Sequence, residues 1–141
     1  MLSRFTLNDL YGQRANLSTA ISNKEAKVAE LEGKIRRLER AANSLERYIT
    51  TIEDSHLKLT NLTIDPSSWQ GTEKKKFDDA HQQLQTNSKG LLIQTESAHS
   101  QVLEEISRCE AQVTSAEATI SHFRNLLADV NAQINARRNK D

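Results

Sequence analysis

The chain has 141 residues, of which 36% are apolar and only 4% aromatic, less than a compact globular core usually carries. Charged residues make up 27%, with 19 basic and 19 acidic side chains, so the formal net charge is zero. A general nucleic-acid or membrane-surface binder needs a basic excess, so this balance speaks against both classes.

The first half carries a heptad repeat, in which apolar residues recur alternately four and three positions apart. Lys24 and His56 are the polar exceptions, and charged stretches such as "EGKIRRLER" lie between the apolar positions. The pattern predicts a long helix over about residues 7–63 with one narrow apolar seam. The seam consists of Leu10, Leu17, Leu31, Leu38, Leu45, Ile52 and Leu59, together with Ile21, Val28, Ile35, Ala42 and Ile49.

The stretch "NLTIDPSSWQG" separates the two halves and contains Pro66, the only proline. Because a residue before proline avoids helical geometry, Asp65 predicts the end of the first helix. Asp65, Ser67 or Ser68 can cap the next helix. We therefore expect a short turn over about residues 64–68.

The same stretch holds the only tryptophan, Trp69, followed two residues later by Gly71. A tryptophan buries a large apolar area, so we expect Trp69 to cover the last apolar layer of the seam at the turn. Gly71 would then let the chain pass close to the indole.

The second half repeats the heptad and predicts a helix over about residues 69–137. Its upstream apolar set is one residue out of phase with the later set, and the two meet at Ala98, Val102 and Ile106. Such a stutter locally unwinds a coiled coil, so we expect a soft, kinked or bulged segment there. The upstream set is Phe77, Leu84, Leu91 and Ala98; the later one is Val102, Ile106, Cys109, Val113, Ala116, Ile120, Phe123, Leu127, Val130 and Ile134.

Two long helices joined by a short turn must lie antiparallel. The sequence therefore predicts an all-α fold, a helical hairpin that forms a single domain over residues 1–141. A hairpin this thin is usually completed by a partner into a bundle of three or four helices. The candidate partner contacts are Leu31 and Leu38 on the seam, with Leu57, Leu62, Leu92, Ile93, Leu103 and Leu126 beside it.

The sequence shows no catalytic constellation, no phosphate-binding loop and no cysteine pair, so we expect neither an enzyme nor a bound cofactor or metal. In a hairpin that turns near residue 68, His56 and His81 would face each other. The simpler interpretation is a polar layer that fixes register. A metal site would need further convergent ligands, and Asp54 and Asp78 are only loosely placed to supply them.

The three residues Trp69, Gln70 and Gly71 form a W-x-G motif between two heptad-rich helices, and Phe77 follows eight residues after the tryptophan. In these features the chain resembles the WXG (Esx-like) small proteins of type VII secretion systems. The resemblance implies a helical hairpin exported folded without a cleaved signal peptide. It also implies a homodimer or heterodimer that forms a four-helix bundle.

The chain is longer than the short founding members of that family, and closer to the hairpin proteins encoded beside LXG-type toxins. It lacks the C-terminal Tyr-x-x-x-Asp/Glu export motif, since its last tyrosine is Tyr48. The resemblance implies an adaptor or targeting chaperone that binds the helical domain of an LXG-type toxin. The alternative is a plain coiled-coil scaffold that forms homo-oligomers, with a fortuitous W-x-G.

The first residues, "MLSRFTLNDLYGQR", lack the apolar run of a secretory signal peptide. The chain contains no run of about 18 apolar residues, which is the length needed to span a membrane. We therefore expect a chain made in the cytoplasm, with export open only to a route that needs no cleaved signal.

Overall fold

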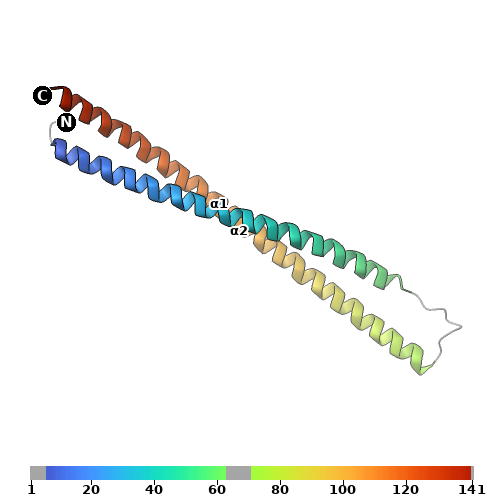
Figure 1. The fold of residues 1–141 in the computed structure, drawn as a ribbon. Helices are drawn as coiled ribbons and strands as arrows, with labels where there is room; N and C mark the ends of the chain where they lie inside the picture. Colours follow the sequence, from blue (N-terminus) through green and yellow to red (C-terminus); the bar gives the residue numbers. More distant parts are fainter. Residues whose placement is uncertain (1–5, 63–70, 141) are drawn as a thin grey trace. The chain divides into compact units, whose positions relative to one another are not determined.

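The computed structural model describes residues 6–62 and 71–140, which form two α-helices (Figure 1). Helix α1 spans Leu7–Thr60 and helix α2 spans Thr72–Lys140. The fold is the all-α helical hairpin that the two heptad patterns predict. Helix α1 ends, and α2 begins, about three residues away from the expected positions, which is the usual uncertainty of helix boundaries.

The hairpin divides into two compact units, each containing part of both helices. The terminal unit consists of Met1–Arg36 and Ser107–Asp141, so the start of α1 lies beside the end of α2 (Figure 1). The turn unit is the continuous stretch Arg37–Ile106. The two units differ in how much apolar surface they bury.

Helix α1 begins with a capping box that the heptad pattern does not reveal. The Asp9 backbone N–H donates to Thr6 Oγ1 at 3.1 Å, and the Thr6 backbone N–H donates to Asp9 Oδ2 at the same distance. Each side chain thus satisfies a backbone donor that has no partner within the helix. The pair fixes the point at which α1 starts.

The terminal unit holds most of the core. Leu10, Val130 and Ile134 form a buried cluster, against which partly buried apolar side chains pack. Lys24 alone among the heptad positions of this part of α1 is exposed, which suits the solvation of its ammonium group. Further along the seam the buried residues are Ile21, Leu31, Cys109, Ala116 and Ile120.

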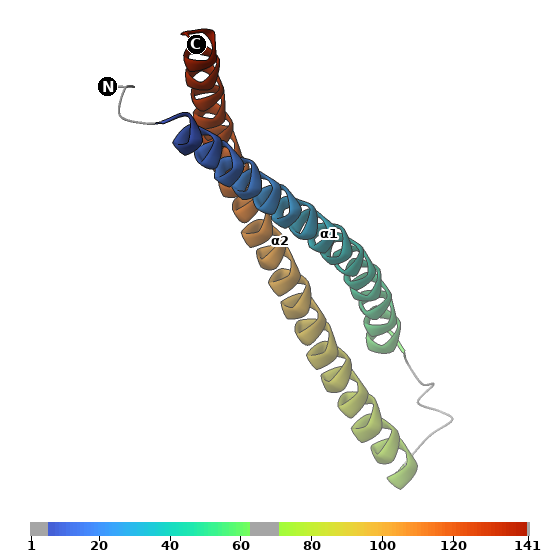
Figure 2. The same cartoon turned by 60° about the vertical axis from the view of Figure 1, so that its left-hand side comes forward.

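The turn unit buries far fewer apolar side chains than the terminal unit. Ala42 and Ile106 are the only hydrophobic residues of its described part that are buried. The α1 heptad still faces α2 there, but Ile52 and Leu59 are only half-buried. Within this unit the ribbons of α1 and α2 separate in Figure 1, and in Figure 2 α1 bows away from α2, in keeping with this looser packing.

In the turn unit, the face that α2 presents to α1 is largely polar. His81 and Ser88 both contact α1 directly. The stripe that contains them recurs at steps of three or four, and Leu84 and Leu91 lie outside it, exposed by 53% and 52%. The buried and half-buried members of the stripe are Phe77, His81, Gln85, Ser88, Leu92, Thr95, His99, Val102 and Ile106.

This arrangement corrects the expectation of a kinked or bulged segment at the stutter. Helix α2 runs without interruption through Ala98, Val102 and Ile106. The helix resolves the phase conflict by extending the later heptad backward, so that the upstream apolar pair Leu84 and Leu91 leaves the seam. Breaking the helix would have lost backbone hydrogen bonds, whereas this solution only exposes two side chains.

Over the described residues, neither helix contains an apolar stretch long enough to cross a membrane.

The difference in burial predicts how two isoleucines of α2 contribute to stability. Ile134 is 1% exposed in the terminal unit, whereas Ile93 is 56% exposed in the turn unit. We expect Ile134→Ala to lower the free energy of unfolding by about 2–4 kcal/mol, because it opens a cavity in a packed cluster. The matched change Ile93→Ala should alter it by less than about 0.5 kcal/mol. Urea denaturation followed by circular dichroism measures both, and equal losses would contradict the assignment of the core.

Candidate partner-binding site

Of the W-x-G motif, the structure describes Gly71, while Trp69 and Pro66 lie outside the described residues. Gly71 immediately precedes α2, and its carbonyl accepts a hydrogen bond from the Lys75 backbone N–H at 3.2 Å. Its φ is +68°, a left-handed conformation that side chains with a Cβ rarely adopt. A Cβ at Gly71 would meet no heavy atom within 4 Å. The glycine is therefore needed for backbone conformation, not for space among the described residues.

Phe77 and His81 lie in the early part of α2, and His81 contacts the last turn of α1. Their rings stack, with centroids 5.5 Å apart and planes at 16°. His81 Nε2 donates a hydrogen bond to the Leu59 carbonyl. Leu59 belongs to the last turn of α1, where carbonyls lack partners within the helix. His81 thus caps α1 from the opposite arm.

The expected pairing of His56 with His81 is wrong. His56 Nδ1 lies 3.2 Å from Ser88 Oγ, one heptad farther along α2 than His81. Both His81 and Ser88 lie on the α2 face that meets α1, and Ser88 is the one that lies level with His56. Each histidine makes its own polar contact across the seam. Over the described residues, no three His, Cys, Asp or Glu side chains gather where they could hold a metal ion.

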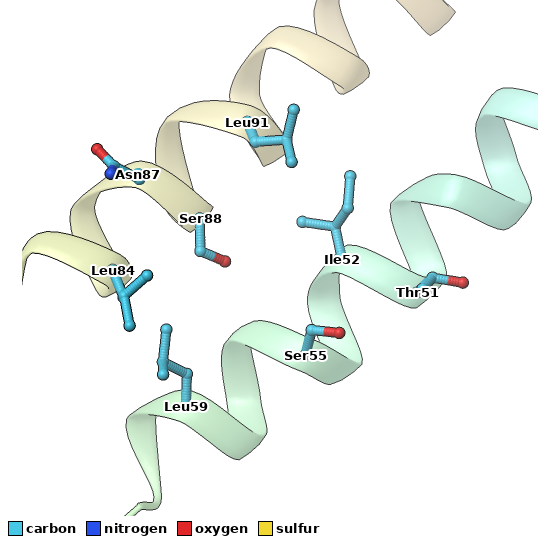
Figure 3. A pocket seen from close by; sticks show the side chains of 8 residues that line it. All are labelled: Thr51, Ile52, Ser55, Leu59, Leu84, Asn87, Ser88 and Leu91. Carbon is cyan, nitrogen blue, oxygen red and sulfur yellow. The ribbon is translucent and has the colours of Figure 1, made fainter. Parts of the chain in front are cut away.

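A groove of about 460 Å³ lies between the arms of the turn unit (Figure 3). In Figure 3, Leu59 of α1 and Leu84 of α2 point toward each other, as do Ile52 and Leu91. Half of the lining side chains are apolar, and the polar ones are uncharged. The groove is lined by Thr51, Ile52, Ser55 and Leu59 from α1 and by Leu84, Asn87, Ser88 and Leu91 from α2.

The partner contacts expected from the sequence do not line this groove. Leu57 lies about 140° around α1 from Ile52, and Ile93 about 180° around α2 from Leu84, at 100° per residue. The signal that could have located the groove was the out-of-phase apolar set of α2. Of the expected contacts, Leu31 is buried, Leu38 and Leu92 are half-buried, and Leu57, Leu62, Ile93, Leu103 and Leu126 are exposed.

Comparison with known proteins gives a family match over most of the chain. A sequence model of the YwqH-like family matches residues 12–132. This span includes nearly all of α1, the segment between the helices and most of α2. No curated protein and no solved structure matches the chain.

The positive φ of Gly71 predicts opposite effects for the same substitution at two glycines. Gly71→Ala should lower the free energy of unfolding by about 1 kcal/mol, because alanine is strained in the left-handed region. Gly90 is helical, and a Cβ there would meet no heavy atom within 4 Å. Gly90→Ala should therefore raise stability by about 0.5–1 kcal/mol through helix propensity. Thermal and urea denaturation check both; destabilisation by Gly90→Ala, or none by Gly71→Ala, would contradict these roles.

The cap that His81 forms predicts a local effect at the end of α1. In His81→Ala, the amides of Asn61 and Leu62, which bond to Leu57 and Leu59, should exchange about fivefold faster, as expected for the loss of about 1 kcal/mol. Hydrogen exchange measured by NMR resolves these amides. The exposed His122 supplies the control: His122→Ala should leave their exchange unchanged, and equal exchange in both variants would rule out the cap.

Proposed function

Because the chain belongs to the YwqH-like family, we propose that it is a non-enzymatic adaptor of an LXG toxin system. YwqH is a Bacillus protein associated with LXG toxins. In this proposal the chain binds a helical segment of a toxin in the cytoplasm and accompanies it to a type VII secretion machinery. Its place among the WXG (Esx-like) proteins is part of the same proposal.

The observation that carries the proposal is the unfinished packing of the turn unit. A soluble helical hairpin usually buries its apolar stripe, yet Leu84 and Leu91 stay more than half exposed beside an open groove. Contiguous apolar surface of this kind marks a protein interaction site. Helical partners are commonly bound by laying an apolar face into such a groove. The arrangement supports a binding protein.

The W-x-G motif supports the link to secretion through its position. Gly71 adopts a conformation that favours glycine directly before α2, so this residue of the motif has a defined role in the backbone. Phe77 packs close by, stacked on His81. We propose that Trp69, Gly71 and Phe77 form a recognition element at the turn for the export machinery.

A coiled-coil scaffold is the competing function, because an exposed apolar stripe also suits self-association. An adaptor and a scaffold differ in the oligomeric state that the chain adopts without a partner. An adaptor awaiting a toxin should be recovered without a stable higher oligomer, whereas a scaffold should form one at any working concentration. Size-exclusion chromatography with light scattering on the full chain separates them.

The direct test is co-expression of the chain with the helical domain of an LXG-type toxin encoded beside it. We expect the two to co-elute as a defined complex through affinity and size-exclusion steps. An unrelated antiparallel coiled-coil hairpin of similar length serves as the control and should not co-elute. If the toxin domain is recovered equally with both hairpins, or with neither, the adaptor function is wrong.

The motif has its own test in a secreting strain. The double change Trp69→Ala and Gly71→Ala should reduce export of the toxin while leaving its complex with the chain intact, because the turn is proposed to contact the machinery and not the toxin. Gly90→Ala is the matched control and should export normally. Unaltered export by the double variant would remove the motif from the proposal.

A further inference from the structure

We infer that the groove of the turn unit receives a single amphipathic helix of the toxin partner, with apolar side chains seven residues apart and no charge on the inserted stripe. The inference rests on the proposed function and identifies where on the chain, and by what chemistry, the partner binds. The groove is lined by four residues of α1, between Thr51 and Leu59, and by four residues of α2, between Leu84 and Leu91 (Figure 3).

The first reason is that two neighbouring stripes of α2 face α1 in this unit, and one of them stays more than half exposed. The stripe through His81 and Ser88 contacts α1 and is largely polar. The apolar pair Leu84 and Leu91 lies at the rim instead. Two leucines one heptad apart that flank a helix–helix seam and stay more than half exposed form the pattern expected where a third helix packs.

The second reason is the absence of charge. Charged residues make up 27% of the chain, yet none lines the groove. The α1 stripe that contains Ile52 and Leu59 continues back to Tyr48, which is uncharged and exposed. Interface cores are depleted in charge and enriched in tyrosine. A charged side chain inserted here would lose its hydration without gaining an opposite charge, so the inserted stripe must be apolar.

The third reason is shape. Ile52 and Leu59 are seven residues apart, as are Leu84 and Leu91, so each pair spans about 10 Å along its helix. A partner helix with apolar residues at the same spacing presents a ridge that fits between these two rows. A symmetric pairing of two copies through this groove would instead bring one concave face against another and leave the space between them unfilled. The stripe from Tyr48 to Leu59 is about 16 Å long, so a partner helix of about three turns would cover it.

The test uses the full chain and the helical domain of the LXG-type toxin as the probe, with affinity measured by calorimetry. The double change Leu84→Gln and Leu91→Gln should weaken binding by about tenfold or more, because both leucines would be central anchors. The matched control is Leu57→Gln and Ile93→Gln, which removes two equally exposed apolar side chains on other faces. The control should bind within about threefold of the unchanged chain. Circular dichroism establishes that both variants keep their helices.

A photo-crosslinking amino acid at single positions gives a second measurement, which does not require the hairpin to fold with glutamine in place of leucine. Placed at Asn87 on the groove rim, it should crosslink the toxin domain; placed at Ile93, it should not. If the unchanged chain fails to bind the toxin domain, the proposed function fails, and this inference with it. If the chain binds but the groove variant binds equally well, the inference is wrong while the adaptor function stands.

The crosslinking experiment can also contradict the inference. Crosslinking at Asn87 between two copies of the chain would make a second copy the occupant of the groove.

Discussion

The rotational phase of α2 is the constraint on which the rest of the turn unit depends. A continuous helix can present only one face to its neighbour, and around Val102 and Ile106 that face belongs to the later heptad. Carried back along the helix, this phase brings His81 and Ser88 against α1 and moves Leu84 and Leu91 to the rim. Backbone hydrogen bonding thus outweighs the burial of two leucines, since a break would leave several peptide groups without partners.

The polar contacts of the turn unit follow from that phase. With polar residues facing α1, the arms are held by specific bonds: His56 to Ser88, and His81 to the Leu59 carbonyl. These bonds fix which residues face each other but bury little apolar area, so they contribute modestly to stability. The terminal unit, with its cluster of Leu10, Val130 and Ile134, has the packing expected of a stable coiled coil. In the proposed function, the partner binds to the turn unit, whose apolar side chains are left partly exposed.

Membership of the YwqH-like family and this division of labour support one another. A chaperone-like adaptor needs a part that folds alone and a part whose packing is completed by its client. The groove in Figure 3 meets the second need with a charge-free lining that would accept an apolar helix. Gly71 of the W-x-G motif lies within the same unit, so the proposed binding of a partner and the proposed recognition by the export machinery would both use this part of the chain.

The sequence by itself determined the two helices, their antiparallel pairing and the α1 seam, because heptad spacing is a local property that a helix converts directly into a face. It did not determine which of two competing α2 phases faces α1, nor that His56 pairs with Ser88 instead of His81. Those depend on how two helices of different length meet across a turn, which no local pattern encodes. The sequence likewise pointed to Gly71 but could not predict its positive φ. Only the tertiary structure decided where the unfilled groove lies, since a groove exists between two surfaces and not within either sequence stretch.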